Sequence, residues 1–155
     1  MGLIEVLVGA AVVTVVLGLS VAAVNNFVEV GKKTADRVAA TYLAQEGVEA
    51  VRFMRDTSWV SLSGVPVDTA RYLDISPTAI ALTATPEVVD GFERVVYVRD
   101  VYRATAGDDI VASTSPVSKA VDPETKVVEV TVSAPESGVA VTLGAYLSNV
   151  WGESP

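Results

Sequence analysis

The sequence predicts an α+β fold, in which a long N-terminal α-helix over about residues 1–55 packs on a small antiparallel β-sheet head. The first observation is a run of 23 consecutive uncharged residues between Glu5 and Glu29, in a region without proline as far as Arg55. The second is a set of strand-like segments after residue 78, in which apolar residues partly alternate with polar ones.

The charged residues are distributed unevenly along the 155-residue chain, which has a formal net charge of −8. Residues 1–28 carry only Glu5, and residues 29–56 carry five basic and five acidic side chains. Residues 57–155 carry six basic and 13 acidic side chains, a net charge of −7. We therefore divide the chain into a hydrophobic N-terminal helix (1–28), an amphipathic half of the same helix (29–56) and a globular β head (57–155).

The composition argues against most catalytic and ligand-binding classes. The chain has no cysteine, which removes disulfides, thiolate metal sites and cysteine nucleophiles, and no histidine, the commonest general base and metal ligand. An acidic head repels phosphate, so nucleic-acid binding has little electrostatic support. We expect no enzymatic activity, no cofactor, no metal site and no nucleic-acid partner.

The apolar run from Val6 to Val28 is long enough to cross a bilayer. A helix of 23 residues is roughly 34 Å long, against a hydrocarbon core of about 30 Å. A secretory signal peptide would need a basic segment first, and no Lys or Arg precedes Lys32. A transmembrane anchor explains the run and the Lys32-Lys33 pair beyond it, but it does not explain Glu5.

Glu5 is the most informative residue of this segment. A carboxylate at the start of a membrane-spanning helix is costly unless it lies in the headgroup region or has a positively charged partner. No basic side chain lies within a helical turn of it, so an α-amino group, its own or that of a neighbouring chain, is the available partner.

The string Leu3-Ile4-Glu5-Val6-Leu7-Val8 resembles the mature N-terminus of type IV pilins and type II secretion pseudopilins. In that family the glutamate is the fifth residue of the processed protein, as it is here. The sequence departs from the family at Met1, where phenylalanine is usual, and at Gly2, where Thr or Ser is common.

The resemblance implies that a prepilin peptidase removes a basic leader, and that Met1 is the new, N-methylated N-terminus. It implies that the subunit waits in the inner membrane, is lifted by an assembly machinery and joins an extracellular filament of identical subunits. It also implies an assembly ion pair between Glu5 of one subunit and the Met1 amine of a neighbour.

The family often has a locally unwound stretch in the first half of this helix. The usual proline near position 22 is alanine here. Because glycine has weak helix propensity, we expect any unwinding to centre on Gly18, within residues 18–25.

The amphipathic half of the helix carries two neighbouring apolar stripes, which we expect to face the sheet and a neighbouring subunit. The helix should end near Asp56-Thr57. The first stripe comprises Val38, Tyr42, Val48 and Val51, and the second Ala35, Ala39, Leu43, Ala50 and Phe53.

In the head, frequent Ser, Gly, Pro and Asp predict an irregular loop over residues 57–78. Strands are expected at 79–84, 92–103, 127–134 and from 139 towards 150, forming a meander with one face on the helix. Trp59 and Trp151 are expected to anchor the core or an interface.

The remaining loop, residues 104–123, contains the adjacent pair Asp108-Asp109. Some secretion pseudopilins bind calcium in a C-terminal loop, but this pair lacks the alternating oxygen ligands of a known calcium loop. A solvated turn is the preferred interpretation.

These observations favour a structural subunit, a pilin that polymerises through its N-terminal helix. The first alternative is a pseudopilin of a type II secretion system, which shares every N-terminal feature. The second is a single-pass, membrane-anchored periplasmic binding module, which would need a pocket of convergent polar groups that the sequence does not nominate.

Overall fold

The computed structural model describes residues 2–76 and 79–152. Its longest element is the helix α1 (Leu3–Thr57), which ends where the sequence predicted. The chain divides into two compact units, Met1–Asp36 and Arg37–Pro155. The first consists of the N-terminal part of α1, and the second contains the remainder of α1 and all the other elements.

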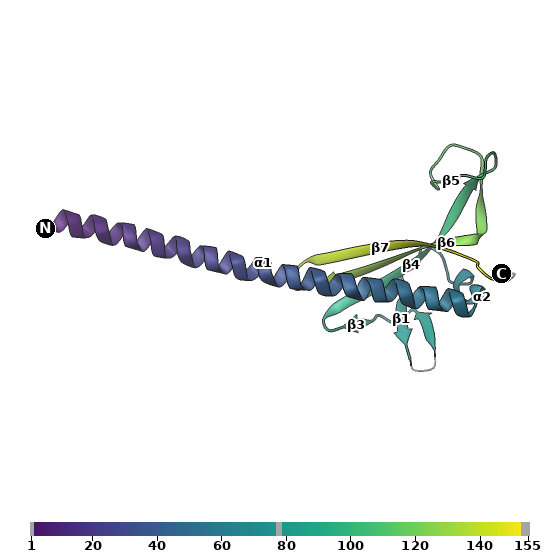
Figure 1. Cartoon of the computed structure of the whole chain (residues 1–155), viewed down its shortest axis with the longest axis horizontal. Coiled ribbons are helices and arrows are strands. Elements are labelled where there is room, and N and C mark those ends of the chain that lie inside the picture. The colour runs from purple at the N-terminus through teal and green to yellow at the C-terminus, as the bar shows by residue number, and fades with distance from the viewer. Residues whose placement is uncertain (1, 77–78, 153–155) are drawn as a thin grey trace. The chain divides into compact units, whose positions relative to one another are not determined.

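The second unit is built on antiparallel strands (Figure 1). The main sheet has the order β3-β4-β6-β7, and β5 pairs with the end of β4. A separate two-stranded sheet consists of β1 and β2. The strands are β1 (Tyr72–Ile75), β2 (Ile80–Thr83), β3 (Val88–Val89), β4 (Phe92–Ala104), β5 (Ile110–Val111), β6 (Lys119–Ala134) and β7 (Val139–Ser148).

The fold class is confirmed, since the helix packs on an antiparallel sheet. The four predicted strands appear as β2, β4, β6 and β7, and β6 begins eight residues earlier than the predicted 127. The last three form the predicted meander, but β2 pairs with β1 in a separate sheet, so the meander does not include it. The early part of β6 is polar, and it is a strand because it pairs with the end of β4 beyond a register shift at Asp100/Val101. A partner strand supplies the backbone hydrogen bonds that the local sequence does not signal.

Two predicted loops contain regular structure, so the prediction was wrong there. Residues 57–78 include β1 and a short helix, α2 (Trp59–Ser63), which buries Trp59 and Leu62 on one face. Residues 104–123 include β5 and the start of β6. In both segments, burial and strand pairing override a composition typical of turns.

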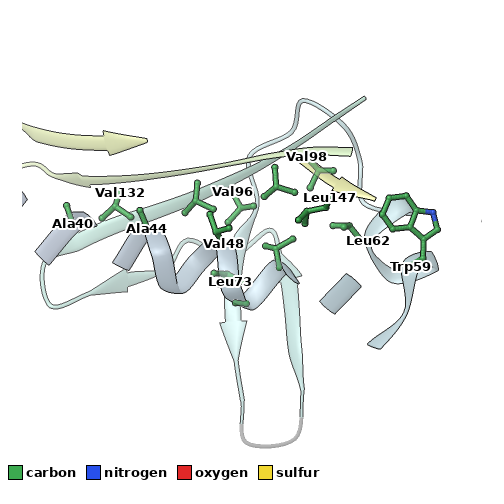
Figure 2. Packing of buried hydrophobic residues seen from close by; sticks show 14 residues of the cluster. Ala40, Ala44, Val48, Trp59, Leu62, Leu73, Val96, Val98, Val132 and Leu147 are labelled. Atoms are coloured by element: carbon green, nitrogen blue, oxygen red, sulfur yellow. The ribbon is translucent and has the colours of Figure 1, made fainter. Parts of the chain in front are cut away.

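The hydrophobic core lies between α1 and the main sheet (Figure 2). Small side chains form the centre of the helix face, with Ala40 and Ala44 fully buried. Val48, Val51 and Ala50 of the predicted stripes are buried, whereas Val38, Tyr42 and Phe53 are exposed. The prediction gave the large apolar side chains of the stripes too large a part in the core. The helix approaches the sheet closely, and a close approach requires small side chains.

The two tryptophans differ. Trp59 is fully buried and belongs to the core, as predicted, whereas Trp151 is 69% exposed. Trp151 therefore anchors nothing among the residues that the structure describes.

Candidate functional site

The N-terminal part of α1 is an apolar surface without a partner inside the chain. Every described residue from Gly2 to Ala35 is exposed, including 16 large hydrophobic side chains between Leu3 and Val30. An 18-residue window of α1 has a mean hydropathy of 2.5, and none of it is buried. By length and composition this helix is compatible with a membrane anchor.

Glu5 lies in the first turn of this apolar helix. Its amide donates to the carbonyl of Gly2 at 3.0 Å, and the residue is exposed. Among the described residues no cation pairs with Glu5, and the first basic residue along the chain is Lys32. The predicted partner, the amine of Met1, lies outside the described residues, as does the predicted N-methylation.

Gly18 lies inside a continuous helical stretch. A Cβ atom at Gly18 would meet nothing within 4 Å, so no packing contact within the chain requires glycine there. Its predicted role as a point of unwinding in an assembly stays a prediction.

Hydroxyl groups in the apolar segment are satisfied within the helix. Thr14 donates to the carbonyl of Ala10, and Ser20 donates to the carbonyl of Val16, each at 2.8 Å. This i to i−4 bonding removes the need for water around the hydroxyls. Sequence inspection did not single these residues out, although the spacing is available to any Ser or Thr inside a helix.

The apolar run ends at a charged pair. Lys33 Nζ lies 2.7 Å from Glu29 Oε1, one helical turn apart, and both side chains are at least half exposed. Charged side chains directly after the apolar run are typical of the boundary between an apolar medium and water.

A buried arginine on β4 ties α1 to the sheet, and the sequence analysis did not identify it. The Arg94 side chain is only 2% exposed. Its Nε and Nη2 lie 2.9 Å and 2.7 Å from the two carboxylate oxygens of Glu87, and Nη1 lies 3.0 Å from Glu46 of α1. Nη1 also donates to the carbonyl of Leu43 at 3.3 Å.

The charge on Arg94 is compensated by these partners. Burial by itself lowers the pKa of Arg94, but the hydrogen bonds and charges of Glu87 and Glu46 outweigh burial and raise the pKa above its ordinary value. The bidentate pair with Glu87 holds the guanidinium in place, and the contacts of Nη1 with Glu46 and the Leu43 carbonyl link it to α1. The sequence signal was weak, because β4 carries Arg94, Arg99 and Arg103, and nothing in the local pattern separates the buried arginine from the other two.

A second ion pair lies at the far end of β4 and β6. Arg103 Nε donates to Asp122 Oδ2 at 2.6 Å, and the amide of Glu124 donates to Asp122 Oδ1 at 2.9 Å. Burial by itself raises the pKa of Asp122, but these hydrogen bonds and one from Thr125 outweigh burial and lower it.

An open hollow of about 580 Å³ adjoins this ion pair. Its only charged lining residues are Arg103, Asp108 and Asp122, and Arg103 already bonds Asp122 and the Asp108 carbonyl. Among the described residues, no group of three or more Asp or Glu side chains could hold a metal ion. The exposed apolar helix with Glu5 is therefore the strongest candidate functional surface.

The comparisons with family models, curated proteins and solved structures gave no match. The described structure has a long N-terminal helix, apolar in its first part, whose C-terminal part packs on an antiparallel sheet, and this is consistent with a pilin-like architecture.

Proposed function

We propose that this chain is a pilin-like structural subunit, which polymerises through its N-terminal helix into an extracellular filament and resides in the inner membrane before assembly. The observation that carries the proposal is the apolar part of α1, no described residue of which is buried by the rest of the chain. Apolar surface of this extent requires lipid or other protein as its environment.

The apolar surface of α1 is covered by lipid before assembly and by neighbouring helices after assembly. A membrane covers the helix of a single subunit, and a bundle of identical helices covers it in a filament. The folded head remains soluble in both states because its core is formed by residues from Ala40 onwards.

Glu5 gives the assembly its register. A carboxylate buried in a bundle of apolar helices costs several kcal/mol unless a cation lies beside it. In the position implied by the family resemblance, Glu5 of one subunit meets the α-amino group of Met1 of a neighbour. Other axial positions leave the carboxylate unpaired and are therefore disfavoured.

Electron microscopy of the native or reconstituted full chain tests the proposal. We expect long filaments with one repeating subunit. A membrane-bound monomer under all assembly conditions would overturn the filament. Short assemblies that appear only with a secretion apparatus would instead favour a pseudopilin.

The variant Glu5→Gln tests the role of the carboxylate. We expect it to enter the membrane normally and to form few or no filaments, because it removes the charge and keeps the shape. The matched control is Glu29→Gln, which removes one carboxylate beyond the apolar run and should assemble. Normal filaments from Glu5→Gln would refute the register role while leaving the filament itself intact.

A further inference from the structure

The strand β7 forms a free edge of the main sheet. It pairs with β6 on one side, and no described strand pairs with the other side. The other edge of β4 is paired with β3 at its start, bridged by Arg71 at Val96 and paired with β5 near its end. Figure 1 shows β7 as the outermost strand beside β6.

The hydrogen-bonding groups of this edge can be assigned. The amide of Asn149 donates to the carbonyl of Glu124 at 2.8 Å, which continues the β6–β7 ladder. Since the two sides alternate along an antiparallel strand, odd-numbered residues of β7 bond to β6. The amides and carbonyls of the even-numbered residues therefore point outward, and all of these residues are exposed: Ala140, Thr142, Gly144, Tyr146 and Ser148.

This edge lacks the features that usually prevent pairing between chains. Natural edge strands are short, bulged, or carry Lys or Pro. β7 has ten residues with no charge and no proline, and its register with β6 has no bulge. The uncharged stretch extends from Ser137 to Gly152, in a chain with a net charge of −8.

The helix-facing side of β7 is incompletely covered. On β6, Val128, Val130 and Val132 are fully buried, whereas Val139, Val141 and Leu143 of β7 are only half-buried. An added strand would continue this apolar row and cover its edge.

We propose that β7 is a self-pairing edge, and that its partner is β7 of a second copy of this chain, running antiparallel. Two acidic chains repel each other, so contact is least opposed where both surfaces are uncharged. Two copies of β7 match in length, charge and alternation. They would also saturate each other's outward amides and carbonyls, leaving no new edge.

Alternation limits the register of such a pair, because opposed residues must lie on the same face of the sheet. We place Gly144 opposite its own copy, where the absence of a side chain lets the two backbones approach. Ala140 then lies opposite Ser148 of the other copy, and Thr142 lies opposite Tyr146.

An antiparallel pair has a twofold axis and closes at two copies. Subunits within one helical filament share a polarity, whereas paired β7 strands reverse it. If the proposed function holds, this contact lies between two filaments. The pair itself does not require polymerisation of α1, so the two proposals can fail separately.

Cysteine cross-linking of the detergent-solubilised full chain tests the pair, because the natural chain has no cysteine. Ala140→Cys and Ser148→Cys copies are mixed and treated with a short thiol-reactive linker. We expect a cross-linked dimer from the mixture and little from either variant alone. Ala84→Cys, exposed and outside the strands, measures random collision.

Gly144→Lys tests the edge independently. A Cβ at this position has ordinary contact with Glu129 Cγ at 3.8 Å, so the fold should be retained, while two like charges would face each other in the pair. We expect it to abolish the cross-link, and Ala84→Lys to preserve it. Cross-linking of Ala140→Cys with itself would indicate parallel pairing or an antiparallel pair centred on residue 140 instead of Gly144. No excess over Ala84→Cys would indicate no pairing. Either result overturns the proposal.

Discussion

Gly47 lies where α1 packs against the sheet, and a Cβ atom there would lie 2.7 Å from Val130 Cγ1. It would also lie 3.4 Å from Arg94 Cδ. Val130 is fully buried and its branched side chain is stiff, so it cannot yield without disturbing the core. Glycine at this position sets the helix–sheet distance.

We therefore expect Gly47→Ala to lower the free energy of unfolding of the head by roughly 1 kcal/mol, although alanine favours helix. Overpacking costs about 1–3 kcal/mol, against a gain of about 1 kcal/mol in helix propensity. Chemical denaturation measures the change. Gly31→Ala, with nothing within 4 Å, is the control and should leave this transition unchanged. A more stable Gly47→Ala variant would contradict the close approach.

Asp122 predicts an acid sensitivity. Its pKa is lowered from the ordinary value of 3.8, so the charged form contributes stability above that value. That contribution is lost as the pH falls below 3.8 towards the lowered pKa. We expect Asp122→Asn to be less stable than the natural chain at neutral pH, and the difference to shrink on acidification.

Thermal unfolding of Asp122→Asn and of the natural chain, from neutral pH to below pH 3.8, measures this difference in stability. The control is Asp74→Asn, an exposed carboxylate on β1, which should reproduce the pH profile of the natural chain. A constant difference between Asp122→Asn and the natural chain at every pH would show that the ion pair with Arg103 does not titrate.

Among elements, the docking of α1 on β4 depends on both apolar and charged contacts. Ala44 and Val48 of α1 provide apolar contacts, and Arg94 of β4 provides the charged link to Glu46 and Glu87. Removing one partner of a buried ion pair costs about 3–5 kcal/mol, because the other is left unpaired.

We expect Arg94→Met to lower the free energy of unfolding by about 3 kcal/mol, the low end of that range because Glu87 is 19% exposed and can recruit water. Urea denaturation measures it. Arg99→Met, on the same strand but 44% exposed, should cost less than about 1 kcal/mol. Adding Glu87→Gln to Arg94→Met should recover part of the loss, and no recovery would assign the cost to packing alone.

For the whole molecule, the division into two compact units has a direct consequence. Every buried residue among those described lies at Ala40 or beyond, so the core of the second unit is formed by residues of that unit. The composition changes after residue 28, whereas the boundary between the two units falls after Asp36. The two positions differ because the turns of α1 between them are polar but still lie outside the core.

We expect a fragment of residues 37–155 to fold by itself, with a denaturation midpoint close to that of the full chain, and to leave the detergent phase. Circular dichroism measures the folding and the denaturation midpoint of the fragment, and detergent phase partition measures whether it leaves the detergent phase. Failure of the fragment to fold would show that residues 1–36 contribute to the stability of the head.

The sequence by itself determined the features that depend on local pattern. The continuous apolar stretch predicted α1 and its exposed N-terminal part, the end of α1 matched Thr57, and the alternation in β4, β6 and β7 predicted strands. The α+β class followed from these elements, because an amphipathic helix and an alternating sheet bury their apolar faces against each other.

Only the tertiary structure decided the features that depend on non-local partners. Polar residues at the start of β6 became a strand because β4 pairs with them, and Arg94 became buried because Glu87 and Glu46 converge on it from elsewhere in the chain. The helix face was selected by fit, which favours Ala40, Ala44 and Gly47 over larger side chains. Backbone pairing, charge compensation and steric fit depend on contacts between different segments of the chain. The local periodicity of the sequence therefore does not predict them.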